Sequence, residues 1–123
     1  YISGKNYGAR KFAPNFTNDE IIDAIKFCHL YGVKIFVTMN TLVKNDEVDE
    51  FLEQVRFLHK NGVDALIVQD FGMICLLRRK FPNLEIHAST QANNSSKEIC
   101  ELYYNLGVKR VVFSRELSID EIR

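Results

Sequence analysis

The sequence predicts an α/β fold with a parallel sheet, arranged as about half of a TIM-type (β/α)8 barrel. A unit made of a helix followed by a strand recurs in residues 19–40, 49–70, 72–91 and 96–116. The strand segments are almost continuously apolar, which is typical of strands covered on both faces. Short connections between alternating strands and helices imply parallel pairing and right-handed crossovers.

Helices are predicted where apolar residues recur at steps of three and four, because this spacing gives a helix one apolar face. These residues are Ile21, Ile22, Ile25 and Cys28 in the first segment, and Val48, Phe51, Leu52 and Val55 in the second. Thr17 and Glu20 have the spacing of a capping box, and so do Ser118 and Glu121. In this motif the hydroxyl and the carboxylate bind free amides of the first turn.

Glycine marks the points where helices are expected to end. Gly32, Gly62 and Gly107 stand at three predicted helix ends, where a left-handed residue is common. A first strand is expected before Arg10. The later strands are predicted at residues 34–39, 65–69, 84–88 and 110–114.

A doubly wound sheet is the alternative arrangement of alternating strands and helices. Such a sheet usually carries a glycine-rich phosphate turn after a strand. The segment from Gly4 to Gly8 lacks that spacing and is not followed by a helical pattern, so the barrel is favoured. A whole barrel takes about 250 residues. Residues 1–123 are therefore expected to form a partial barrel domain of a longer protein.

Composition and cysteine usage narrow the class of protein. The 16 basic and 16 acidic side chains give no net charge that would attract nucleic acid or a membrane surface. No apolar run approaches the roughly 18 residues of a membrane span. We interpret Cys28, Cys75 and Cys100 as buried free thiols, with a metal or redox role as the alternative. Such cysteines fit a reducing cytoplasm, which is the predicted location.

Polar residues follow every predicted strand. Working residues of a barrel lie at the C-terminal ends of its strands, so these side chains are expected to converge on one cavity. They are Arg10, Asn40, Gln69, Asp70, Ser89, Gln91, Ser114, Arg115 and Glu116, together with His87 inside its strand. For each one alone, a capping or loop role is the simpler alternative.

His87 and two arginines are the candidates with the clearest chemistry. If Ile86 faces the helices, strand alternation turns His87 and Gln91 toward the barrel axis. There His87 could act as acid, base or ligand, or be a hydrogen-bonded interior residue. The guanidinium groups of Arg10 and Arg115 suit two-pronged binding of a carboxylate or phosphate. We interpret the remaining basic run, Arg78, Arg79 and Lys80, as a solvated helix face near the C-terminus of its helix.

Five segments in this order resemble the collagenase-like peptidase family U-thirty-two (U32). They are GARKFAPNF, VTMNTLV, GVDALIVQD, FPNLEIHASTQAN and LGVKRVVFSRELSIDEI, so the resemblance runs through essentially the whole chain. It implies a bacterial cytoplasmic enzyme family first described as peptidases. Some members hydroxylate RNA bases, one of them depending on prephenate, and others act in oxygen-independent ubiquinone hydroxylation. Several carry an iron–sulfur cluster on four cysteines.

The resemblance also implies which residues form the site. Catalytic roles are expected for His87, Asp70 and Glu116, where a peptidase would need a base and metal ligands. Substrate-binding roles are expected for Arg10, Asn15, Asn40, Gln69, Ser89, Thr90, Gln91 and Arg115.

Three functions remain open at this point. The longer protein is expected to be a peptidase acting on peptides, or alternatively a cluster-dependent hydroxylase of tRNA or rRNA bases or of a quinone precursor. The third alternative is a fragment that only folds. The family's cysteine signature would come after Arg123, so the chain itself is expected to hold no cofactor and to be inactive. An iron–sulfur cluster or a divalent metal is expected only in the longer protein. Open sheet edges predict a homo-oligomer.

Overall fold

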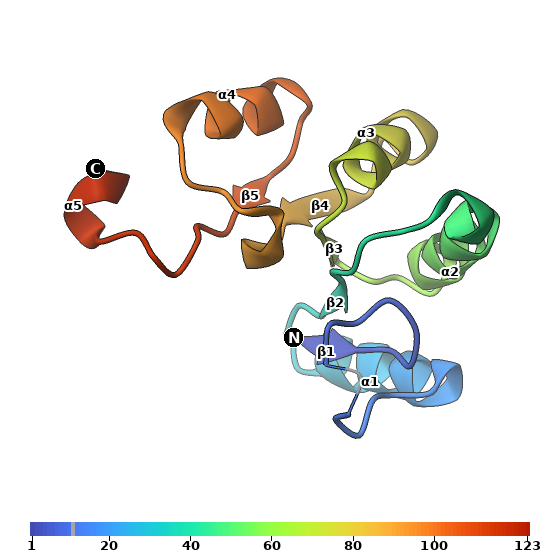
Figure 1. Cartoon of the computed structure of the whole chain (residues 1–123). Coiled ribbons are helices and arrows are strands. Elements are labelled where there is room, and N and C mark those ends of the chain that lie inside the picture. The colour runs from blue at the N-terminus through green and yellow to red at the C-terminus, as the bar shows by residue number, and fades with distance from the viewer. Residues whose placement is uncertain (11) are drawn as a thin grey trace.

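A computed structural model describes residues 1–10 and 12–123. Five parallel strands form one sheet in the order β1-β2-β3-β4-β5, which confirms the predicted α/β fold (Figure 1). The strands are β1 (Ile2–Ser3), β2 (Phe36–Met39), β3 (Ala65–Val68), β4 (Glu85–Ala88) and β5 (Arg110–Val111). The α-helices are α1 (Asn18–Leu30), α2 (Val48–Lys60), α3 (Phe71–Lys80), α4 (Lys97–Asn105) and α5 (Ile119–Ile122). Two short 3-10 helices, η1 (Asn45–Glu47) and η2 (Thr90–Ala92), lie in loops after strands.

Helices α1 to α4 follow one another around the outer side of a curved row of strands, as in one part of a barrel (Figure 1). The register pairs Val37 with Leu66 and Leu66 with Ile86, and all three belong to the buried core. Helices contribute Ile21, Ile25, Phe51, Leu52, Val55, Leu58, Ile74, Leu77 and Tyr103 to the same core. Burial of this one face therefore fixes which way each strand turns its side chains.

The opposite face of the sheet carries a small mixed cluster of aromatic and charged side chains. His87 and Phe36 meet edge to face, with ring centroids 4.9 Å apart. Tyr1 packs on the same Phe36 ring at 5.4 Å, and the Arg110 guanidinium lies 5.7 Å from its centroid. Arg110 also donates a hydrogen bond to the Tyr1 hydroxyl at 3.2 Å. Side chains of the chain itself thus cover part of the face that would form a barrel interior.

The capping boxes and glycines that predicted helix ends from the sequence are found at helix ends in the structure. Capping boxes are present at Thr17 and at Ser118. Gly32, Gly62 and Gly107 have φ angles of 68°, 89° and 80°, in the left-handed region where glycine is favoured. In the described part of the chain, no helix combines the length and the apolar character needed to cross a membrane.

Two sequence interpretations need correction at the level of local structure. The last strand was expected at residues 110–114 but ends at Val111. Gln91 was expected to continue the alternation of the preceding strand, but it lies in η2, beyond the end of β4. Strand alternation therefore says nothing about the direction of the Gln91 side chain.

Arg78 was interpreted as part of a solvated helix face, and the structure corrects this. Its guanidinium donates to three backbone carbonyls, those of Leu84 at 2.9 Å, Leu106 at 3.1 Å and Pro82 at 3.1 Å. One half-buried side chain thereby joins the end of α3 to the turns before β4 and β5. Its neighbour Arg79 is exposed and fits the original interpretation.

We expect Arg78→Ala to lower the free energy of unfolding by about 2 kcal/mol, because it removes charge-assisted hydrogen bonds to partly buried carbonyls. Chemical denaturation measures this loss. Arg79→Ala on the same helix is the control and should stay within about 0.5 kcal/mol of the parent. Equal losses in the two variants would contradict the structural role of Arg78.

Self-association remains a prediction for this chain. Strands β1 and β5 are the two edges of the sheet, and each has a single neighbour in the described structure. Edge strands with free amides and carbonyls recruit further strands. We expect light scattering at micromolar concentration to give a dimer or a larger species. A monomer would contradict this prediction and would mean that the side chains around Phe36 cover the open face of the sheet well enough to prevent association.

Candidate functional site

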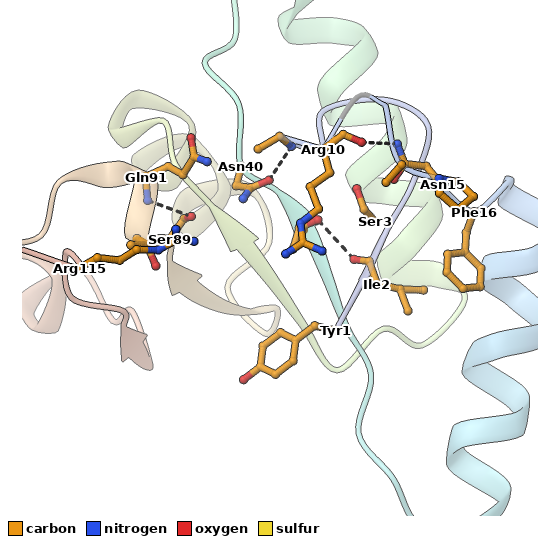
Figure 2. A pocket seen from close by; sticks show the side chains of 15 residues that line it. Tyr1, Ile2, Ser3, Arg10, Asn15, Phe16, Asn40, Ser89, Gln91 and Arg115 are labelled. Atoms are coloured by element: carbon orange, nitrogen blue, oxygen red, sulfur yellow. Dashed lines mark hydrogen bonds between the residues drawn. The ribbon is translucent and has the colours of Figure 1, made fainter.

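A cavity of about 400 Å³ opens where β1, β2 and β4 end; we call it the strand-end cavity (Figure 2). Parallel strands bring their C-terminal ends, and the loops that follow them, to the same edge of the sheet. The structure brings seven of the predicted substrate-binding residues together at this cavity: Arg10, Asn15, Asn40, Ser89, Thr90, Gln91 and Arg115. Their role in binding stays a prediction.

Several lining residues were missed by the sequence reasoning. Tyr1, Ser3 and Thr38 line the cavity together with residues of the first loop. β1 is only two residues long, so no strand pattern pointed to Ser3. Thr38 could have been found, because it stands two residues before Asn40 in the alternation of its strand.

Two asparagines hold the loop that carries Arg10. The side-chain oxygen of Asn40 accepts a hydrogen bond from the Ala9 amide at 3.0 Å. The Asn15 side-chain amide donates to the Arg10 carbonyl at 2.9 Å. Both contacts are dashed in Figure 2. They fix the backbone on either side of the Arg10 Cα and leave its guanidinium free.

The start of this loop packs closely on β1. A Cβ atom on Gly8 would lie 1.9 Å from the Ser3 hydroxyl oxygen, so only glycine fits there without a shift of its neighbours. This close approach places the loop directly over a lining residue of the strand-end cavity.

Tyr7 anchors the same loop from the other side. Its φ of 63° is unusual for a residue with a side chain, and the Thr41 hydroxyl donates to its carbonyl at 3.3 Å. The ring packs against Phe51, with centroids 5.2 Å apart. Burial raises the pKa of Tyr7, and the carboxylates of Glu50 and Glu47 add to this. The phenol is therefore neutral and serves as an anchor.

The charge of the cavity comes from its arginines. Arg10 lies on the side of the loop after β1 and Arg115 on the side of the chain after β5 (Figure 2). Both are exposed, and neither side chain makes a hydrogen bond or ion pair with the described residues. The described lining contains no carboxylate, imidazole or thiol. Free guanidinium groups among neutral hydrogen-bonding groups suit a phosphate or a carboxylate.

His87, expected to be catalytic, belongs to β4 and lies outside the described lining of the cavity. Only 1% of its surface is exposed, and its Nε2 atom is 2.7 Å from the Glu85 carboxylate. Its Nδ1 atom is buried with no hydrogen-bond partner in the described structure.

The other expected catalytic and binding residues are also placed apart from the lining. Asp70 caps α3, since one carboxylate oxygen accepts from the Met73 amide at 3.1 Å and the other from the Val43 amide at 3.2 Å. Glu116 is exposed in a turn, and Gln69 is half-buried after β3. No hydrogen bond or ion pair of the described residues joins His87, Asp70 and Glu116, so their catalytic role stays a prediction.

The described residues do not fit a metal cluster. Cys28, Cys75 and Cys100 are half-buried free thiols on α1, α3 and α4. Among residues 1–10 and 12–123, no group of three histidine, cysteine, aspartate or glutamate side chains could hold a metal ion. Accordingly, no chemical step is assigned to a cluster held by these residues.

Comparisons with known proteins connect this geometry to a family. The sequence model of Peptidase family U32 matches residues 1–123. The chain is 42% identical over 123 residues to the 23S rRNA 5-hydroxycytidine C2501 synthase of Escherichia coli. It is 38% identical over 123 residues to tRNA hydroxylation protein P1 of Bacillus subtilis, and 33% identical over 123 residues to the uncharacterized protease MJ0090 of Methanocaldococcus jannaschii.

The chain spans only part of these proteins. The alignments cover 100% of this chain but 18%, 29% and 30% of the three relatives. The structure of the U32 peptidase Mk0906 matches with a TM-score of 0.75 at 16% identity, over 91% of this chain and 48% of that chain. This structural likeness concerns the fold.

We expect Asn40→Ala to release the loop that carries Arg10. Loss of one hydrogen bond lowers the free energy of opening this loop by about 1 kcal/mol, so hydrogen exchange at the Ala9 amide should become about five times faster. Exchange followed by NMR measures this rate. Asn105→Ala, at an exposed position at the end of α4, is the control and should leave the Ala9 amide unchanged. An unchanged rate in Asn40→Ala would show that the loop does not depend on this contact.

Proposed function

Because the chain belongs to peptidase family U32, we propose that it forms the substrate-binding part of an enzyme that hydroxylates a base of ribosomal or transfer RNA. Two of its relatives, which align over its full length, are named for hydroxylation of rRNA and of tRNA. The proposal concerns the whole protein, because the chain covers less than a third of either relative.

The lining of the strand-end cavity is the observation that carries this proposal. Hydrolysis of a peptide needs a base within hydrogen-bond reach of the attacking water. The described lining offers no carboxylate or imidazole for that task. It offers the guanidinium groups of Arg10 and Arg115, which bind anions. This set of groups favours recognition of an anionic substrate over hydrolysis.

In the proposed function, Arg10 and Arg115 hold an anion and the neighbouring neutral groups orient it. The anion is either a phosphate of the RNA or a carboxylate of a co-substrate, because both offer two oxygen atoms that can accept the two parallel hydrogen bonds of a guanidinium group. A volume of about 400 Å³ lies within the range of small-molecule sites, so the cavity suits one nucleotide or one co-substrate at a time. Enzymes that modify a base take it out of the stack to reach it.

Binding and orientation are the tasks that we assign to this chain. Hydroxylation of a base replaces a C–H bond by a C–OH bond, which needs an oxygen donor and an acceptor for two electrons. The described residues provide neither, so we assign the oxidation to other parts of the longer protein or to a co-substrate.

Peptide hydrolysis is the second candidate function. One relative of 33% identity is named an uncharacterized protease, and the family carries the name peptidase. In that case the expected catalytic residues His87, Asp70 and Glu116 would need a different arrangement from the one described above.

The decisive experiment compares RNA nucleosides with and without the full-length protein. We expect deletion of its gene to remove one nucleoside that is heavier by one oxygen atom, as measured by mass spectrometry of digested rRNA and tRNA. The parent gene should restore it, and Arg10→Ala or Arg115→Ala should restore much less, because the anion is no longer held.

Arg79→Ala is the matched control, because it removes an exposed guanidinium group on α3, outside the described lining of the strand-end cavity. A gene with this change should restore the nucleoside fully. Unchanged nucleosides, together with cleavage of casein or gelatin by the purified full-length protein, would refute the hydroxylase and support the peptidase.

A further inference from the structure

Asn94 is a buried polar residue that the site described so far does not use. It has 0% of its surface exposed and lies outside the described lining of the strand-end cavity. The preceding residue, Asn93, ends η2 in the left-handed conformation with a φ of 55°. This turn sends the Asn94 side chain inward, between the loop after β4 and the chain after β5.

Asn94, in the loop after β4, makes three hydrogen bonds, and two of them reach the chain after β5. Its side-chain amide donates to the Ser89 carbonyl at 2.8 Å and to the Val112 carbonyl at 2.7 Å. Its backbone carbonyl accepts from the Ser114 amide at 3.0 Å. Ser89 lines the cavity on the β4 side, and Arg115 directly follows Ser114. Asn94 therefore ties one wall of the cavity to the segment that carries its second arginine.

The segment after β5 has few other ties. The last bond that continues the sheet is donated by the Val112 amide to the Ala88 carbonyl at 3.0 Å. Apart from this bond, Asn94 makes all the described hydrogen bonds that connect residues 112–123 to the rest of the chain. Helix α5, at the end of this segment, stands apart from the other helices (Figure 1).

The chemistry of the side chain supports a positioning role over simple packing. Both partners of the Asn94 amide are carbonyl oxygens, so only the NH2 group can serve them. The side-chain oxygen is buried without a partner in the described structure, which is unfavourable. An apolar side chain of similar size would avoid that cost. The two donated hydrogen bonds are therefore what favours asparagine at this position.

We propose that Asn94 is a positioning residue that holds Arg115 at the rim of the strand-end cavity. The inference rests on the proposed anion-binding role of Arg115 but not on the reaction that follows binding. Arg10 is held independently, by Asn40 and Asn15. Loss of the Asn94 contacts should therefore weaken one side of the site only.

The test is a double-mutant cycle in the full-length protein, with inorganic phosphate as the probe and its dissociation constant measured by calorimetry. Asn94→Asp keeps the size of the side chain and removes both donors when its carboxyl group is ionised. We expect it to weaken phosphate binding about tenfold, as a lost charge-assisted contact does. In this background Arg115→Ala should add little, whereas Arg10→Ala should keep its full effect.

Two further variants separate positioning from charge and from unfolding. Asn93→Asp adds the same charge at the exposed neighbouring residue and should leave phosphate binding unchanged. Asn94→Ser adds no charge and keeps one donor, so it should fold and give a smaller loss with the same dependence on Arg115. The melting temperature of each variant confirms that it is folded.

The outcomes are distinguishable. Additive losses in Asn94→Asp and Arg115→Ala, or unchanged binding in both Asn94 variants, would overturn the positioning role while leaving the anion site intact. Unchanged binding in Arg10→Ala and Arg115→Ala would overturn the anion site itself, and the positioning role with it. If the double-mutant cycle shows the expected coupling but the protein hydroxylates no RNA, the positioning role stands and the proposed reaction is refuted.

Discussion

Parallel pairing of the five strands is the constraint on which the rest of the structure depends. Only parallel strands bring the loops that follow them to a single edge of the sheet. The register that pairs Val37 with Leu66 and Leu66 with Ile86 buries one face against the helices. The same register turns Thr38 and His87 to the other face, toward the side where the strand-end cavity opens. Burial of the helix-facing residues thus determines which polar groups lie on the face opposite the helices.

The fold was largely predictable because its signals are local. Apolar runs, capping boxes and glycines at helix ends each depend on a few neighbouring residues, and the structure has all of them. Arg78 was misread because its carbonyl partners belong to turns up to 28 residues away. Such partners are not visible in a local pattern. β1 is held by pairing with β2 and has too few residues to show a pattern of its own.

The sequence predicted which polar residues lie near one another better than it predicted the contacts that each of them makes. Arg10, Asn40, Ser89 and Arg115 were expected to converge because they follow strands, and they line one cavity, while their role in binding stays a prediction. However, a polar residue at a strand end can either face a ligand or hold a loop. The Asn40 oxygen and both Asp70 oxygens bind backbone amides, so these groups order the loops. The two arginines make no such contacts with the described residues, and they remain available for an anion.

The proposed function requires that the strand-end cavity binds an anion between Arg10 and Arg115. Crystals of the full-length protein soaked in selenate, a heavy-atom analogue of sulfate and phosphate, test it most directly through anomalous diffraction. We expect a selenium peak within hydrogen-bond reach of both guanidinium groups, and its loss in crystals of Arg115→Ala. A well-occupied peak elsewhere on the protein, with none in this cavity, would show that Arg10 and Arg115 do not form an anion site.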